Sequence, residues 1–147
     1  LPVIGSVTTK ATVSRFARVL GTLVYGGVPI LEALHIAGLS AGNRVFIDSA
    51  QHVENDVKEG VAIHQAMLDT GSFPPVLTHM VAIGEETGDL PKMLGRVADS
   101  LDFEVDNGLR RLTSMFEPLI VLTMGLIVGF VVVAVLLPIF QSQELVK

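Results

Sequence analysis

The chain has 147 residues, a formal net charge of −5 and no cysteine, and half of its residues are hydrophobic. This composition excludes intrinsic disorder, a disulfide scaffold, thiolate catalysis, iron–sulfur clusters and cysteine-based zinc sites. The acidic balance and the scarcity of aromatic residues argue against nucleic-acid binding. The mean hydropathy of +0.59 is nevertheless high for a chain with 17 % charged residues. Residues 119–140 explain it, because 18 of these 22 residues are apolar and none is charged.

Proline and glycine divide the first part of the chain at helix-length intervals, and no stretch alternates polar and apolar residues as a strand would. An amphipathic stripe at residues 16–24 predicts a first helix, which Gly26 and Gly27 close. Further helices are predicted over residues 30–38, from the N-cap Asn43 to about Glu59, over 61–69, and over 76–83 with a stop at Gly84. The fold class is therefore all-α, an antiparallel six-helix bundle followed by one transmembrane helix.

The sixth predicted helix starts at residues 89–91, and its apolar stripe runs from Met93 to Phe116 without a strong breaker before Pro118. The last bundle helix is therefore expected to be continuous with the span, with a bend near Pro118. Residues 119–140 cover roughly 33 Å as a helix, enough for a ~30 Å hydrocarbon core. Within the span, Gly125 and Gly129 form a GxxxG step that favours close packing against another helix.

The charges beside the span predict its orientation. Arg110 and Arg111 precede it, whereas the tail after it offers only Lys147, so the bundle is expected on the cytoplasmic side. Lys10, Arg15 and Arg18 form a second basic group at the opposite end of the domain, and they would also face the membrane surface if another span preceded Leu1. The predicted domains are a membrane-exit segment at 1–10, the cytoplasmic bundle at 11–117, the transmembrane helix at 118–140 and a short external tail at 141–147.

Two acidic groups are candidates for binding. Residues 84–89 are expected to form a loop, in which Glu85, Glu86 and Asp89 could dock a basic partner, hold the turn into the sixth helix or, less plausibly, bind Ca²⁺. The spacing of these carboxylates excludes an EF-hand. A second acidic group follows the sixth helix at Asp99, Asp102, Glu104 and Asp106. It fits either a solvated face or a docking surface.

No pattern in the sequence predicts a catalytic, metal or cofactor site. Ser40 lies in a G-x-S-x-G pattern, but a nucleophile elbow needs a strand before the serine, and the preceding residues are predicted to be helical. An intramembrane serine hydrolase using Ser40 therefore remains only an unfavoured alternative. The four histidines lack metal-site spacing. Residues 27–34 and 60–67 echo each other at an offset close to a tetratricopeptide period, which favours two similar helix starts and leaves a tail-anchored helical-repeat adaptor as another alternative.

Several stretches together resemble the inner-membrane platform proteins of type II secretion and type IV pilus systems. They occur in family order and cover nearly the whole chain: 15–23, 26–34, 73–75, 83–90, 104–106, 112–114, 117–119 and 136–140. The stretch Ile83-Gly84-Glu85-Glu86-Thr87-Gly88-Asp89-Leu90 is the most specific of them.

The resemblance implies a non-enzymatic component of the bacterial inner membrane, with two further spans and a similar cytoplasmic domain upstream and a short periplasmic tail. It implies coupling of a cytoplasmic assembly ATPase to the insertion or extraction of pilins or pseudopilins. The implied partners are that ATPase, the pilins or pseudopilins, other inner-membrane machine components and further copies of the protein. Pilus assembly and secretion both remain open.

Overall fold

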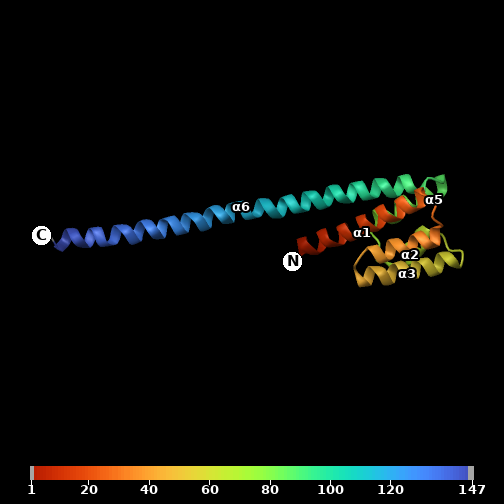
Figure 1. The fold of residues 1–147 in the computed structure, drawn as a ribbon, viewed down its shortest axis with the longest axis horizontal. Coiled ribbons are helices and arrows are strands. Elements are labelled where there is room, and N and C mark those ends of the chain that lie inside the picture. The colour runs from red at the N-terminus through yellow and green to blue at the C-terminus, as the bar shows by residue number, and fades with distance from the viewer. Residues whose placement is uncertain (1, 146–147) are drawn as a thin grey trace. The chain divides into compact units, whose positions relative to one another are not determined.

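The computed structural model describes residues 2–145, with side chains from residue 4, and divides into two compact units, Leu1–Gly108 and Leu109–Lys147. All regular structure in the described residues is helical, which confirms the all-α prediction. The helices are α1 (Pro2–Tyr25), α2 (Ile30–Ser40), α3 (Arg44–Lys58), α4 (Ile63–Thr70), α5 (Pro75–Thr87) and α6 (Leu90–Leu145) (Figure 1).

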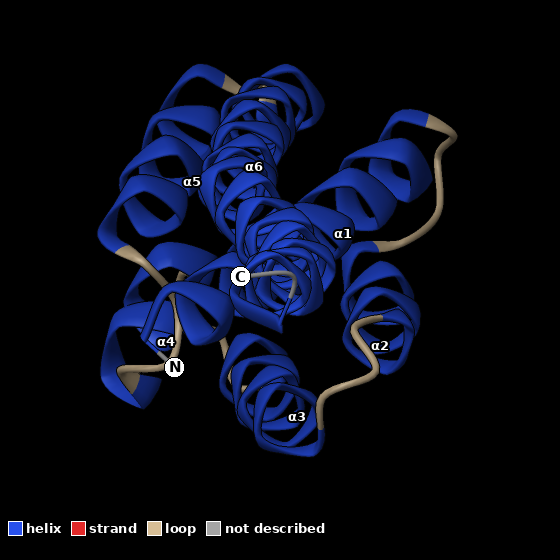
Figure 2. Ribbon diagram, turned by 90° about the vertical axis from the view of Figure 1, so that its left-hand side faces the viewer, coloured by secondary structure: helices blue, strands red, loops and turns tan. Residues whose placement is uncertain are grey.

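The first unit is a helical bundle in which helices that follow each other in the chain are neighbours. Contacts join α1 to α2, α2 to α3, α3 to α4 and α4 to α5. Residues 90–108 of α6 return beside α1, where ion pairs join the two helices. Figure 2 looks along the bundle and shows α1 to α5 in order around it, with α6 between α5 and α1. The two ends of this unit's chain therefore pack against each other.

Three phenylalanines from distant parts of the sequence meet in the core. The ring centroids lie 5.2 Å apart for Phe16 and Phe46, 5.7 Å for Phe16 and Phe73, and 4.9 Å for Phe46 and Phe73. All three side chains are buried. Edge-to-face aromatic pairs contribute about 0.5–1.5 kcal/mol each beyond their burial. This cluster ties α1, α3 and the segment before α5 together.

The turns confirm most of the predicted helix ends. Asn43 caps α3, because its Oδ1 accepts hydrogen bonds from the backbone N–H groups of Val45 and Phe46 at 3.0 and 3.3 Å. Gly27 and Gly60 both have positive φ, at 87° and 99°, which glycine adopts without steric cost. Each precedes a helix start by three residues, so the echo in the sequence reflects two similar turns within one bundle.

Two local predictions need correction. Helix α5 does not stop at Gly84 but continues to Thr87, so Glu85 and Glu86 lie on its last turn and not in a loop. Helix α2 extends beyond residue 38 to Ser40. The predicted stripe at residues 16–24 is the second half of α1, which begins at Pro2. The predicted end of α5 at Gly84 was wrong for a physical reason. Gly84 is buried against Leu90, and a Cβ at this position would come within 2.8 Å of the Leu90 Cα. This glycine permits close packing and does not end the helix.

The second unit consists of α6 from residue 109 onward. Helix α6 runs without a break from Leu90 to Leu145, with Pro118 and Pro138 inside it, which confirms that the last bundle helix continues into the apolar segment. It is the one helix in the described part of the chain that is long and apolar enough to cross a membrane. The stripe predicted to run to Phe116 is buried at Met93, Leu94, Val97 and Leu101, whereas Leu109 and Phe116 are exposed.

Candidate docking and membrane-facing sites

The junction of α5 and α6 is a tight glycine turn. Gly88 has a φ of +74°, and the backbone N–H of Asp89 donates to the Gly84 carbonyl at 3.1 Å. The Asp89 carbonyl then accepts from the backbone N–H of Met93 at 3.3 Å, at the start of α6. This arrangement satisfies backbone groups that a helix end would otherwise leave unpaired. The motif at residues 83–90 therefore builds the connection between two helices.

Glu85 reaches from this junction to the start of α4. Its carboxylate accepts hydrogen bonds from the backbone N–H groups of Ile63 at 3.0 Å and His64 at 2.8 Å, and lies 2.9 Å from His64 Nδ1. The residue at the N-cap position of α4, Ala62, has no side chain that could do this. Glu85 thus acts as the N-terminal cap of α4 from another helix, where a carboxylate also complements the helix dipole.

The other two candidate docking residues are differently placed. Glu86 and Asp89 are exposed, and neither side chain forms an ion pair within 4 Å in the described part of the chain. Of the three candidate docking carboxylates, Glu85 therefore forms hydrogen bonds within the bundle, while Glu86 and Asp89 face solvent.

The candidate membrane-surface residue Arg18 lies against α6. Its guanidinium donates to Asp99 Oδ1 at 2.9 Å and to Asp102 Oδ2 at 2.7 Å. The Ser14 hydroxyl donates to Asp102 as well and lies 3.2 Å from the Ala98 carbonyl oxygen. Further along the same pair of helices, Lys10 Nζ lies 2.8 Å from Glu104. These contacts form an ionic ladder between α1 and α6, made of Lys10, Ser14, Arg18, Asp99, Asp102 and Glu104.

The ladder shifts the protonation equilibria of its members. The hydrogen bonds to Asp99 and then to Asp102 raise the pKa of the Arg18 guanidinium. The hydrogen bond from Ser14 is the largest cause that lowers the pKa of Asp102. Burial opposes it, and the hydrogen bond and charge of Arg18 add to the lowering. Three of the four carboxylates in the acidic group on α6 are therefore paired with the two cations Lys10 and Arg18 of α1.

The remaining candidate residues are exposed. Arg15 is exposed on α1, and Arg110 and Arg111 are exposed on α6. A Cβ added to Gly125 or Gly129 would meet nothing within 4 Å, so no described segment packs on the GxxxG step.

Ser40 has none of the geometry of a nucleophile elbow. It lies on the last turn of α2, where its hydroxyl donates to the Ala37 carbonyl at 2.7 Å. The described residues contain no strand from which such a turn could rise. The G-x-S-x-G pattern is explained by a helix end followed by a turn at Gly42, whose φ is +74°.

Sequence reasoning missed three features of these sites. It paired neither Glu85 with α4 nor α1 with the acidic face of α6, because both contacts join residues more than twenty positions apart. One sequence signal could have indicated the contact of Glu85 with α4. The residue at the N-cap position of α4 is Ala62, whose side chain cannot accept a hydrogen bond, so another residue has to cap the helix. The third feature is a groove between α1 and α6, with a volume of about 480 Å³.

The class of fold that the described residues define is a helical bundle whose last helix continues into a candidate membrane span. The family model that matches residues 16–138 is the one for type II secretion system protein F. The chain belongs to this family.

The relatives carry names from two kinds of machine. The chain is 40 % identical to the type IV pilus assembly protein PilC of Pseudomonas aeruginosa over 146 residues, covering 99 % of this chain and 39 % of that protein. It is 40 % identical over 142 residues to the PilC protein of Thermus thermophilus, covering 96 % and 35 %. It is 38 % identical over 147 residues to the type II secretion system protein F of Aeromonas hydrophila, covering 100 % and 38 %. The chain thus spans little more than a third of the length of these relatives.

Proposed function

We propose that this chain is part of a non-enzymatic platform component of a type IV pilus or type II secretion machine in the bacterial inner membrane. In this role it couples a cytoplasmic assembly ATPase to the insertion or extraction of pilins or pseudopilins. The observation that carries the proposal is the unbroken helix α6, which joins a folded bundle to a candidate span in a member of this family. A displacement of the bundle would pass directly into such a helix.

The proposed topology places the bundle in the cytoplasm and the tail after residue 140 in the periplasm. Arg110 and Arg111 lie about 12–14 Å before Leu119 along α6, just outside the headgroup region, from which their long side chains can reach the lipid phosphates. Each contributes on the order of 1 kcal/mol of attraction to an anionic surface. Arg15 adds to this only if further spans precede Leu1, as we propose for a multi-pass protein. Arg18 contributes less, because two carboxylates already bind it.

Glu86 and Asp89 are the proposed docking residues for cytoplasmic machinery or a sister bundle. Glu86→Lys is expected to leave the bundle folded and to abolish pilus or secretion assembly, because it reverses a solvent-facing charge without breaking a contact. Glu59→Lys, at another exposed helix end, is the matched control and should assemble normally. If Glu86→Lys also assembled normally, Glu86 would have no docking role.

Gly125 and Gly129 are proposed to pack against another spanning helix of the machine, either in the same protein or in a second copy. Both lack Cβ atoms and sit one helical turn apart, which lets two backbones approach closely. The open space around them in this chain leaves room for such a helix.

The experiment that tests the platform role is a detergent pull-down of the full-length protein against candidate assembly ATPases and pilins or pseudopilins. Retention of an ATPase together with a pilin supports a pilus platform, and retention of an ATPase together with a pseudopilin supports a secretion platform. If the protein retained none of them, the proposal would be overturned.

A further inference from the structure

One face of α6 stays apolar beyond the part of the helix that belongs to the bundle. Successive residues of a helix are turned by about 100°, so the residues that share a face can be found from the sequence. Within an arc of about 120° on α6, every position between residues 101 and 119 is apolar or glycine. These positions, which we call the apolar arc, are Leu101, Val105, Gly108, Leu109, Leu112, Met115, Phe116 and Leu119.

The described residues bury only the first part of the apolar arc. Leu101 is buried, whereas Met115 and Phe116 are 72 % and 58 % exposed. The polar residues that follow Leu109 in the same segment lie outside the arc and are exposed as well: Arg110, Arg111, Thr113, Ser114 and Glu117. An amphipathic helix normally packs its apolar face against another element. Residues 109–118 therefore have one side suited to water and one side that lacks a partner.

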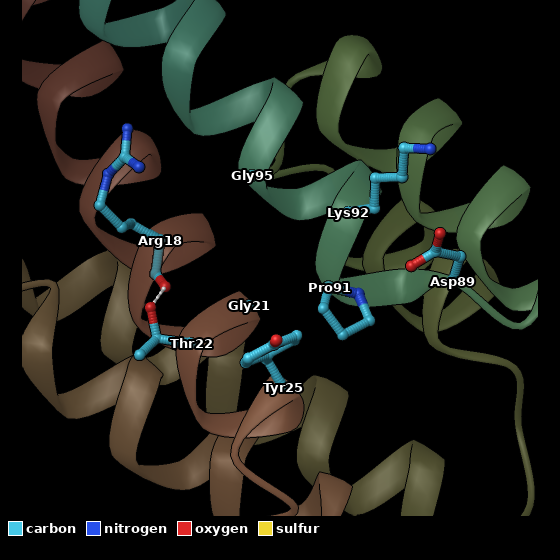
Figure 3. Close-up of a pocket in the computed structure, with 8 residues that line it drawn as sticks. All are labelled: Arg18, Gly21, Thr22, Tyr25, Asp89, Pro91, Lys92 and Gly95. Atoms are coloured by element: carbon cyan, nitrogen blue, oxygen red, sulfur yellow. Dashed lines mark hydrogen bonds between the residues drawn. The ribbon is translucent and has the colours of Figure 1, made fainter.

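Helix α1 is the element that covers the arc as far as Gly108. Figure 3 shows α1, with Gly21, beside the start of α6, with Gly95. A Cβ at Gly21 would lie 3.1 Å from the Leu94 Cβ, and a Cβ at Gly108 would lie 2.6 Å from Val7 Cγ2. Moving from position 21 back to position 7 on α1 thus matches moving from 94 forward to 108 on α6. The two helices are antiparallel and stay in register over this length.

The contacts between these two points keep the same register. The Ser14 hydroxyl lies 3.2 Å from the Ala98 carbonyl oxygen. Further along both helices, Lys10 Nζ lies 2.8 Å from Glu104. A regular register of this kind is typical of two helices that pack along a shared apolar stripe.

We propose that a helix continuing α1 upstream of Leu1 in the full-length protein packs on the exposed part of the apolar arc. The register places the position just before Leu1 opposite Met115, and a position one turn further upstream opposite Leu119. An antiparallel pair of helices then joins the bundle to the membrane. The inference rests on the multi-pass topology of the proposed function. The chain spans 39 % of the length of its Pseudomonas aeruginosa relative, so a protein of that length has further residues outside this chain.

The geometry favours this occupant over an α6 helix from a second copy. In every copy α1 already lies on the arc at Gly108, so a second α6 helix that followed the arc would collide with it. A helix that continues α1 is already aligned with the arc. Pro2 is compatible with such a continuation, because α6 itself passes through Pro118 and Pro138 without a break. Since the arc carries no charge, the upstream helix is expected to present apolar side chains every three or four residues.

Disulfide formation tests the register, since this chain has no cysteine. Val7→Cys with Gly108→Cys is the positive control, because a Cβ at Gly108 lies 3.9 Å from the Val7 Cβ, within the range of about 3.5–4.5 Å that a disulfide requires. Met115→Cys is then combined, in the full-length protein without other cysteines, with a cysteine at each of the four positions before Leu1 in turn. In native membranes, at least one of these pairs is expected to close a disulfide within one chain at a rate within tenfold of the control.

Ser114→Cys is the matched control for Met115→Cys. It lies one residue away along α6, is also exposed and stands outside the arc. Its pairs with the same upstream cysteines should close at least tenfold more slowly. The inference would be overturned if no Met115→Cys pair closed while the positive control did, or if the Ser114→Cys pairs closed equally fast. Disulfide-linked dimers of Met115→Cys alone would assign the arc to a second copy and would overturn it as well.

The labelling rate of single cysteines gives an independent measurement. In native membranes containing the full-length protein, Met115→Cys should react with a water-soluble maleimide at least tenfold more slowly than Ser114→Cys, because the upstream helix covers it. Equal rates would contradict the contact. The pull-down of the natural protein distinguishes this failure from a failure of the proposed function. Retention of the ATPase and a pilin or pseudopilin, without protection of Met115→Cys, would leave the platform role standing and refute only the paired helices.

Discussion

Glu85 and Glu86 are neighbours in the sequence, yet their carboxylates serve different purposes. On the last turn of α5, successive side chains point about 100° apart, so one faces α4 and the next faces solvent. The Glu85 carboxylate has three hydrogen-bond contacts with Ile63 and His64 at the start of α4. The Glu86 carboxylate is exposed to solvent. At the scale of single residues, the role of a carboxylate is therefore determined by the helix face on which it lies, and not by its charge alone.

The cap of α4 gives a prediction at this scale. Glu85→Ala is expected to lower the free energy of unfolding by about 1–2 kcal/mol, because the backbone N–H groups of Ile63 and His64 lose their acceptor. Hydrogen exchange should show faster exchange of these two amides. Glu86→Ala is the control and should change stability by less than about 0.5 kcal/mol. Equal protection of both amides in the two variants would disprove the cap.

The ionic ladder gives a dependence on pH. The pKa of Asp102 is lowered below its usual value of 3.8, so its ionised form stabilises the folded state above that pH. This contribution is lost as the pH falls through the lower pKa of the folded state. It is less than about 1 kcal/mol, because the side chains of Arg18 and Asp102 are both about half exposed to solvent.

The measurement is chemical denaturation of the natural chain and of Asp102→Asn between pH 7 and pH 2.5. The variant should be less stable at pH 7, and the difference should vanish at the acidic end. A difference that stays constant across this range would show that Asp102 acts through packing and not through its charge.

At the scale of elements, the α5–α6 turn depends on a close approach. A Cβ at Gly84 would come within 2.8 Å of the Leu90 backbone, whereas a Cβ at Gly95 would meet nothing. Gly84→Ala is therefore expected to destabilise the bundle by about 1–3 kcal/mol. Gly95→Ala should stabilise it by up to about 1 kcal/mol. Thermal unfolding in detergent, followed by circular dichroism, compares the two, and a similar effect of both would contradict the packing argument.

Some of the helices and their ends could be predicted from the sequence, and others could not. The helix from Asn43, the stripe at residues 16–24 and the continuation of α6 into the apolar segment were predictable, because capping and periodicity are local signals. The end of α5 was not, because a glycine that permits packing looks in the sequence like a glycine that ends a helix. The pairing of α1 with α6 was not predictable either, since it depends on how the chain closes its bundle.

For the candidate site, local signals identified which residues carry charge but not what each charge meets. Glu85, Glu86 and Asp89 were singled out together because they lie within five residues of each other in the sequence. Their division into one capping and two solvent-facing carboxylates follows from the length of α5. Arg18 was singled out for a membrane surface, and its partners on α6 come from about eighty residues further along the chain.

At the scale of the whole molecule, we propose that α6 transmits displacement between bundle and span, because it is one continuous helix. The proposal depends on the segment between Gly108 and Pro118, in which no residue is buried and Leu112 alone is half-buried. A helix transmits force along its axis, whereas a flexible linker of glycine and serine does not.

The most direct test inserts seven residues after Thr113 in the full-length protein, either as a flexible glycine–serine segment or as an alanine-rich helical segment. Two helical turns keep the faces of α6 nearly in register, so the helical insertion should preserve assembly of pili or secretion of substrate. The flexible insertion should abolish it, although the protein still folds, inserts and retains its assembly ATPase. Normal assembly with the flexible insertion would contradict coupling through α6.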